Sequence, residues 1–265
     1  MTGFAPDHGE AEVRVSPNFG PRRDGKRADA IILHYTGMET GEAAEAWLCN
    51  PESQVSAHYL VHEDGRVVQM VREVDRAWHA GASSWYGETD MNSRSIGIEI
   101  VNPGHFLGYP EFGDRQVEAV IELCRGISLR HAVVPERVLA HSDIAPARKI
   151  DPGEKFPWDR LSAAGVGHFV EPVPMREGRA LSRESIGVDV EGLQSMLALY
   201  GYGVDISGTF DEGTWQVVAA FQRHFRPAWV DGAADESTIE TLRAGQSGCD
   251  PSTARPRRPP LPVRR

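Results

Sequence analysis

The chain has 265 residues, of which 40% are hydrophobic and 25% are charged. These values are ordinary for a globular protein that buries a core. No apolar run approaches the roughly 20 residues that a membrane-spanning helix needs, so no transmembrane segment is expected. The formal net charge of −10 disfavours nucleic acid as a partner, because an acidic protein repels phosphate backbones.

The three cysteines, Cys49, Cys124 and Cys249, lie far apart and form no CxxC pair, so neither a disulfide framework nor a thiolate zinc site is indicated. The N-terminus carries acidic residues where a signal peptide would be basic, and it lacks an apolar stretch. We therefore expect a cytoplasmic protein, with the cell envelope or periplasm as the alternative. The sequence gives no indication of the oligomeric state.

The first half of the chain alternates segments typical of strands and helices. An Asp64-Gly65 step between two apolar runs indicates a β-hairpin. Strands mixed with helices in this way predict an α/β domain with a mixed central β-sheet flanked by helices. The predicted elements are a strand over 29–35, a helix over 42–49, hairpin strands over 57–62 and 66–71, a strand over 95–101, a helix over 114–131 and a short strand over 138–141.

The second half begins with a segment rich in Gly and Pro, which is typical of a linker. Helical periodicity then returns over 188–200, 211–225 and 235–244, which predicts a small three-helix domain. The Pro/Arg-rich end of the chain is expected to be disordered. The predicted division is a first domain over 1–158, a linker over 159–180, a helical domain over 181–246 and a tail over 247–265.

Two histidines stand at the ends of short apolar strands, where sites of α/β proteins usually lie. They are His34, which follows AIIL, and His141, which follows RVLA. Asp151 comes ten residues after His141, within HSDIAPARKIDPG. Two imidazoles and one carboxylate suit a catalytic Zn²⁺ ion whose fourth position is left for water.

A hydrolytic zinc site also needs a base and a stabiliser of the developing oxyanion. Strand alternation over 95–101 places Glu99 opposite the isoleucine face, where it either opens to a cleft or lies on the solvated face of an edge strand. Lys149 could donate to the oxyanion. Alternatively, Lys149 is a solvated lysine in a loop.

The other histidines have different expected places in the fold. His79 is a candidate for contacts with a ligand or with the metal-binding residues. For His58 such contacts and packing in the core or hairpin are both open, whereas packing in the core or hairpin is favoured for His62. His131 is explained by its place at a helix C-terminus. Four are expected to be surface residues: His8, His105, His168 and His224.

The segments ILHYTG, VSAHYLVHEDGRV, RAWHAG, SIGIEI and HSDIAPARKIDPGEKFPW together resemble the zinc-dependent N-acetylmuramoyl-L-alanine amidases of the AmpD/AmiD type. The resemblance runs from about residue 14 to 160. Residues 193–223 resemble a helical peptidoglycan-binding domain, although a generic helical packing module explains their apolar residues equally well.

The resemblance implies an enzyme that hydrolyses the amide between N-acetylmuramic acid, or its anhydro form, and L-alanine. His34, His141 and Asp151 would then be the ligands of one Zn²⁺ ion. Glu99 would be the acid/base, and Lys149 would support the tetrahedral intermediate. Substrate contacts are assigned to four residues: His58, His79, Asn92 and Arg94.

Two rival functions stay open from the sequence. One is a peptidoglycan-binding protein without catalysis, and the other is a zinc hydrolase that acts on a different amide. Polymeric cell wall and soluble anhydro-muropeptides are both possible substrates, and the stem-peptide preference is not indicated. Zinc content and amine release from a muropeptide discriminate an enzyme from a binding protein.

Overall fold

A computed structural model describes residues 3–176 and 178–248. Its centre is a mixed six-stranded sheet in the order β1-β5-β4-β7-β3-β8, in which only β4 and β5 pair antiparallel. The strands are β1 (Glu12–Val13), β3 (Ala30–Tyr35), β4 (Tyr59–Val61), β5 (Val67–Gln69), β7 (Ser95–Ile100) and β8 (Val138–Ala140), and a separate two-stranded sheet joins β2 (Phe19–Gly20) to β6 (Arg76–Ala77).

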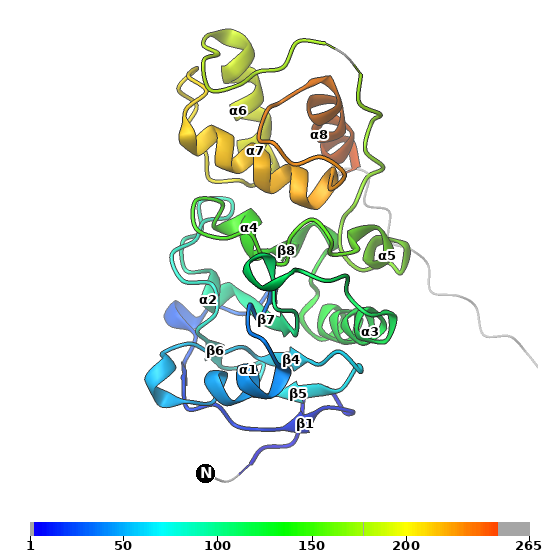
Figure 1. Ribbon diagram of the computed structural model, residues 1–265. Coiled ribbons are helices and arrows are strands. Elements are labelled where there is room, and N and C mark those ends of the chain that lie inside the picture. The colour runs from blue at the N-terminus through cyan, green and yellow to red at the C-terminus, as the bar shows by residue number, and fades with distance from the viewer. Residues whose placement is uncertain (1–2, 177, 249–265) are drawn as a thin grey trace, which may run out of the picture.

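Helices cover both faces of this sheet, and three more form a C-terminal helical unit (Figure 1). This confirms the predicted α/β fold followed by three helices. None of the helices in the described part of the chain is long and apolar enough to cross a membrane. The helices are α1 (Gly41–Leu48), α2 (Met91–Arg94), α3 (Asp114–His131), α4 (His141–Ile144), α5 (Trp158–Ala163), α6 (Val188–Tyr200), α7 (Glu212–Phe225) and α8 (Glu236–Gly248), with 3-10 turns η1 (Arg23–Gly25), η2 (Pro51–Ser53), η3 (His105–Leu107) and η4 (Pro135–Arg137).

The two faces of the sheet bury different clusters. Ile96, Ile98 and Ile100 of β7 point to the face that α3 covers, as strand alternation predicted. On the opposite face, α1 packs over β4 and β5, and the C-terminal helical unit packs over β3 and β8. The face shared by α1 and the helical unit is the one on which β7 presents Glu99.

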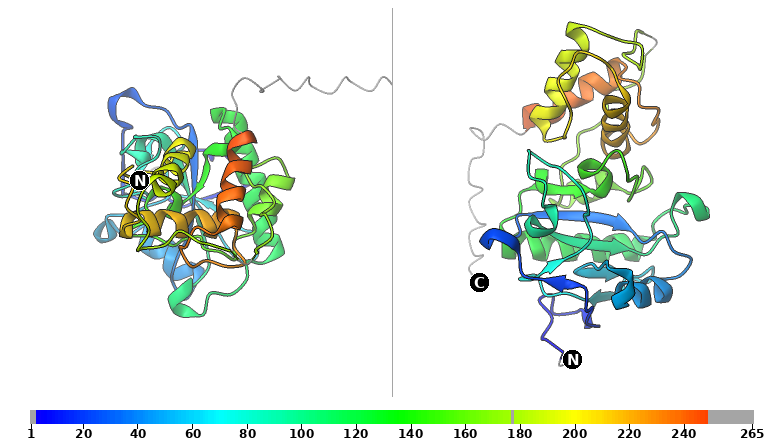
Figure 2. Two further views of the ribbon diagram at one scale, coloured as in Figure 1. Left: turned by 90° about the horizontal axis from the view of Figure 1, so that it is seen from above. Right: turned by 90° about the vertical axis from the view of Figure 1, so that its left-hand side faces the viewer.

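The C-terminal helical unit is packed directly onto the α/β part. Ile32 of β3, Leu139 of β8 and Ile144 of α4 share one buried cluster with Tyr202 and Phe221. Figure 2 shows the same stacking from two further directions, with α6, α7 and α8 lying side by side on one end of the sheet domain. The two parts therefore share a hydrophobic core.

The structure does not test the predicted domain boundaries, which stay predictions. The boundary after residue 158 falls at the first residue of α5, and α8 reaches Gly248, just inside the predicted tail. Residues 249–265 lie outside the described residues, and with them the prediction of a disordered tail.

Candidate functional site

His34 and Glu99 meet on one face of the sheet because β3 and β7 run parallel. The Cα register pairs His34 with Glu99 directly. β7 lies between β4 and β3, so the edge-strand alternative for Glu99 is wrong. Both side chains face a cavity of about 350 Å³.

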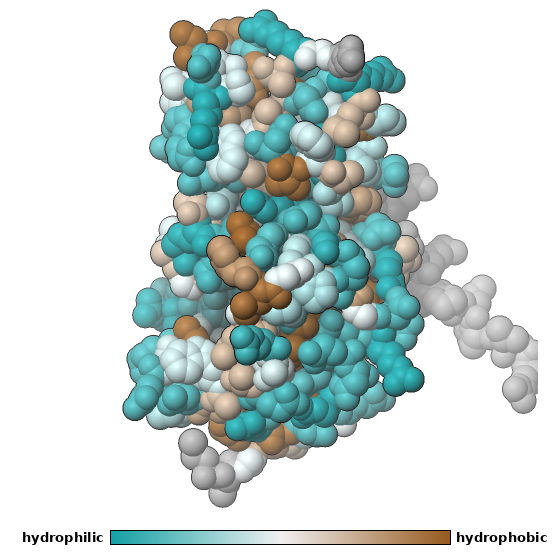
Figure 3. All heavy atoms as spheres, in the orientation of Figure 1, coloured by the Kyte–Doolittle hydropathy of each residue, from teal (hydrophilic) through white to brown (hydrophobic). Residues whose placement is uncertain are grey.

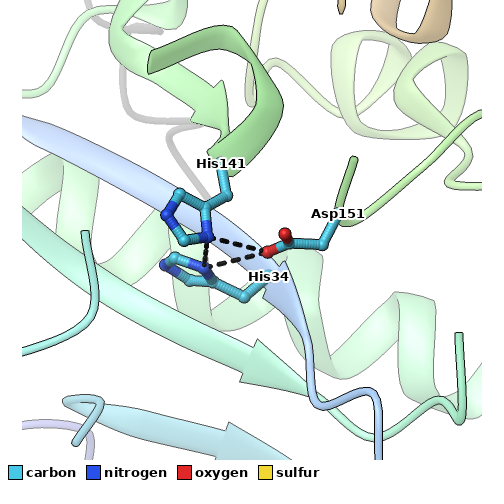
Figure 4. A group of neighbouring side chains, drawn as sticks. All are labelled: His34, His141 and Asp151. Carbon is cyan, nitrogen blue, oxygen red and sulfur yellow. Dashed lines mark hydrogen bonds and ion pairs between the residues drawn. The ribbon is translucent and has the colours of Figure 1, made fainter. Parts of the chain in front are cut away.

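The loop that follows β8 brings the other two predicted ligands to the same point. β8 ends where α4 begins, so His141 is the first residue of α4. The Ser142 backbone N–H donates to the Asp151 carbonyl at 3.0 Å, which returns the chain beside His141. Figure 4 shows the three side chains converging from β3, α4 and this loop.

Three donor atoms of these residues lie at nearly equal separations. His34 Nδ1 is 2.9 Å from His141 Nδ1 and 3.1 Å from Asp151 Oδ2. The third side of the triangle, from His141 Nδ1 to Asp151 Oδ2, is 3.0 Å. One ion with bonds of about 2.0–2.2 Å can bridge atoms spaced in this way. Within the described part of the chain, no other group of three such side chains converges like this.

The outer nitrogens of both imidazoles are held by a second layer of residues. His141 Nε2 lies 3.1 Å from the carbonyl of Ala80, so this nitrogen carries the proton and Nδ1 presents its lone pair. His34 Nε2 lies 3.0 Å from His79 Nδ1. Partners of this kind orient the ligands of a metal and tune their basicity.

Asn92 holds this second layer in place. Its Oδ1 accepts hydrogen bonds from the backbone N–H groups of His79 at 2.9 Å and of Ala80 at 2.8 Å. A single amide thereby fixes both the ring that contacts His34 and the carbonyl that contacts His141. Asn92 is 7% exposed, and the structure places it in support of residues 79 and 80.

Burial and neighbouring charges shift the pKa values of His34 and Asp151. Burial first, and then the neighbouring His141 ring, lowers the pKa of His34 from 6.5 to about 4. Burial by itself would raise the pKa of Asp151, but charge interactions and hydrogen bonds with the two histidines lower it below its ordinary value. A neutral imidazole and an ionised carboxylate are the forms that bind a metal ion.

Glu99 has the environment of a proton-transfer group. Burial, reinforced by the charge of Asp151, raises its pKa well above 4.5, and the nearby Lys149 opposes that shift. The Oε2 atom of Glu99 is buried and has no hydrogen-bond partner in the described structure. A buried carboxylate oxygen left without a partner beside a cavity points to a ligand or water that completes it.

The cavity extends from the three donor atoms between α1 and the loop that carries Asp151. Lys149 lines it together with Asp151. Its far rim is apolar, with Trp47 of α1 exposed to 46% and Phe106 of η3 exposed to 92%. Apolar residues form a band on the front face between α1 and the C-terminal helices (Figure 3). Sequence reasoning missed both rim residues, because an exposed aromatic carries no periodic signal.

The predicted substrate contacts do not all reach this cavity. His79 lines it, but His58 and Arg94 do not. The fully buried His58 accepts a hydrogen bond at Nδ1 from the Gly97 N–H at 2.9 Å, and burial lowers its pKa to about 3. Arg94 pairs with Asp29 at the opposite end of the strands. In the structure, His58 and Arg94 therefore bond to other residues of the chain and do not line the cavity.

The surface expectation for His224 is wrong. This side chain of α7 is 2% exposed and lies 2.8 Å from the carboxylate of Asp143. His8, His105 and His168 are half-buried. His105 contacts Tyr35, which follows His34 in the chain, and Glu154, which lies three residues after Asp151. A polar sequence setting gave no signal of these contacts, which the packing of distant segments creates.

Comparison with known families matches both parts of the chain. The family model described as N-acetylmuramoyl-L-alanine amidase matches residues 24–154. A model of peptidoglycan-binding domains matches residues 187–242. N-acetylmuramoyl-L-alanine amidase AmiD of Escherichia coli (strain K12) is 38% identical over 224 residues, which cover 80% of this chain and 80% of AmiD.

Solved structures give the same picture. E. coli AmiD in complex with the substrate anhydro-N-acetylmuramic acid-L-Ala-D-gamma-Glu-L-Lys superposes with a TM-score of 0.72 at 36% identity, covering 89% of this chain and 93% of AmiD. AmpDh3 from Pseudomonas aeruginosa, in complex with anhydromuramic pentapeptide, superposes with a TM-score of 0.68 at 29% identity and covers 89% of this chain and 95% of AmpDh3. Both likenesses extend across the α/β part and the helical unit.

Proposed function

The chain belongs to the N-acetylmuramoyl-L-alanine amidase family, and from that premise we propose that it hydrolyses the amide between N-acetylmuramic acid, or its anhydro form, and the L-alanine of a stem peptide. The observation that carries the proposal is the convergence of three donor atoms beside the unpartnered Oε2 of Glu99 in one cavity. A protein that only bound peptidoglycan would not need this combination.

We propose that His34, His141 and Asp151 hold one Zn²⁺ ion. Two imidazole nitrogens and one carboxylate oxygen are a typical donor set of catalytic zinc, which keeps an open position. When bound, zinc polarises a carbonyl group and lowers the pKa of a bound water to about 7. The hydrogen bond from His141 Nε2 to Ala80 and the low pKa of His34 both keep ligand lone pairs available.

Glu99 is the proposed acid/base. Its carboxylate takes a proton from the attacking water and passes it to the nitrogen of the leaving L-alanine. The raised pKa of Glu99 suits a group that must hold this proton between the two transfers. Lys149 is proposed to donate a hydrogen bond to the oxyanion, since it lines the cavity beside Asp151.

We propose residues 1–158 as the amidase domain and 181–246 as the peptidoglycan-binding-like domain, joined by residues 159–180.

Polymeric cell wall and soluble muropeptides are both proposed substrates. Cytoplasm is the proposed compartment, with the cell envelope as the alternative, and fractionation of cells with an antibody against the chain decides between them.

The proposed function is tested by mass spectrometry of products from intact sacculi and from soluble anhydro-muropeptides. We expect release of a peptide with a free L-alanine amino group, lost on chelation and restored by Zn²⁺. Glu99→Gln is expected to retain zinc and to lose about 100- to 10,000-fold in kcat. Release at wild-type rate by zinc-loaded Glu99→Gln would contradict the role of Glu99. Zinc binding with no release from any muropeptide would favour a different amide substrate.

A further inference from the structure

Asp143 links the proposed metal site to the C-terminal helical unit. It lies two residues after the ligand His141, in the first turn of α4, and is 1% exposed. Its Oδ2 accepts a hydrogen bond from the Ala140 backbone N–H at 2.8 Å, at the point where β8 becomes α4. The carboxylate therefore fixes the backbone on both sides of His141.

Two side chains of the helical unit form hydrogen bonds with the carboxylate of Asp143. Tyr202 Oη donates to Oδ1 at 2.8 Å, and His224 Nδ1 lies 2.8 Å from Oδ2. Tyr202 is 3% exposed and His224 is 2% exposed, so water does not replace either partner. A buried carboxylate is costly without such donors, and removing one leaves part of that cost uncompensated.

Packing around these hydrogen bonds holds the helical unit against the α/β part of the chain. The ring of His224 stacks on Trp158, with centroids 3.7 Å apart. Trp85 meets Tyr202 edge to face at 5.0 Å, and the Tyr86 N–H donates to the Gly201 carbonyl at 2.8 Å. A module that moved freely on a tether would not bury such contacts.

We propose that the C-terminal helical unit is a structural part of the metal site, in which Tyr202 and His224 are positioning residues that hold His141 through Asp143. This inference rests on the proposed zinc site. It assigns the helical unit a role in the catalytic site, whether or not the unit also binds glycan. Loss of either donor loosens α4, which carries His141, and weakens zinc binding without touching a ligand.

The test uses the full chain and the variants Tyr202→Phe, His224→Gln and Tyr200→Phe. Tyr200→Phe is the matched control, because it removes from the same unit a hydroxyl that contacts His168, whereas the donors to Asp143 are Ala140, Tyr202 and His224. Zinc affinity is measured by competition with a chromophoric chelator, alongside the unfolding midpoint of the metal-free protein and the visible spectrum of the Co²⁺-loaded protein.

We expect Tyr202→Phe and His224→Gln to weaken zinc binding about 10- to 100-fold, the range for residues that orient metal ligands, and to alter the Co²⁺ spectrum. Tyr200→Phe should stay within about twofold of wild type. Equal zinc affinities and spectra in folded Tyr202→Phe and wild type would overturn the inference, even if stability fell. A wild-type chain that binds no zinc would instead overturn the proposed function.

Discussion

His34 and Glu99 are direct neighbours across the parallel strands β3 and β7, so the central sheet itself places a proposed metal ligand beside the proposed acid/base. β7 pairs with β4 on one side and β3 on the other, which leaves Glu99 no freedom to shift along the strand. A site built on central strands is held more rigidly than one built on loops.

Replacing Lys149 by Met is expected to lower kcat by about 100- to 1,000-fold, the typical cost of losing one oxyanion donor. KM and zinc content should change little, because no hydrogen bond or ion pair joins the Lys149 side chain to His34, His141 or Asp151 in the described structure. Lys155→Met is the control, since Lys155 belongs to the same loop and pairs with Glu111. Equal rates for the two variants would remove Lys149 from the mechanism.

Gly97→Ala tests the support that His79 gives to His34. A Cβ atom at residue 97 would lie 2.4–2.6 Å from atoms of the His79 ring, and β7 is paired on both sides and cannot retreat. Displacement of His79 removes its contact with His34 Nε2, so zinc affinity should fall about 10- to 100-fold. The control Gly192→Ala meets no atom within 4 Å and should bind zinc as wild type does.

Stability of the metal-free protein should fall as the pH is lowered. Burial, followed by the charge of Arg22, lowers the folded pKa of His58 to about 3, whereas the unfolded value is about 6.5. Between these values the unfolded chain binds more protons, so the stabilisation is complete above pH 6.5 and is lost towards pH 3. His34 and His79 shift in the same direction.

For His58 alone, this loss is about 2 kcal/mol between pH 6.5 and pH 5. Urea unfolding at the two pH values measures it. His58→Asn keeps an acceptor for the Gly97 N–H and should show a smaller difference between the two pH values, whatever its stability at pH 7. An unchanged pH dependence in that variant would mean that His58 is not buried in its neutral form.

Phe106→Ala tests whether the apolar rim of the cavity contacts substrate. The ring is 92% exposed beside the cavity, so contact with a substrate would bury it. Its removal should raise KM about tenfold, the equivalent of about 1.4 kcal/mol, with kcat within about twofold. Leu129→Ala, an exposed residue of α3 outside the cavity, is the control for surface truncation. If both variants keep the wild-type KM, the rim does not contribute to binding.

Local patterns in the chain were enough to predict most of the elements and the candidate metal ligands. Apolar runs and the Asp64-Gly65 turn predicted β3, β4, β5 and β7, because the periodicity of strands and helices is a local property of the chain. Strand-end positions singled out His34 and His141 for the same reason. The family resemblance added the reaction, and the matches to AmiD and to the amidase family model confirm the family.

The residues that support the site could be recognised only from the packing of distant segments. The contacts of Asn92 with residues 79 and 80, and of His224 with Asp143, join segments 12 or more residues apart, for which no local pattern exists. His224 stands in a polar stretch of sequence and yet is buried, because α7 packs against α4. The burial of a side chain and its hydrogen-bond partners depend on which distant segments meet. Here they follow from the packing of the helical unit and the sheet domain around one shared core.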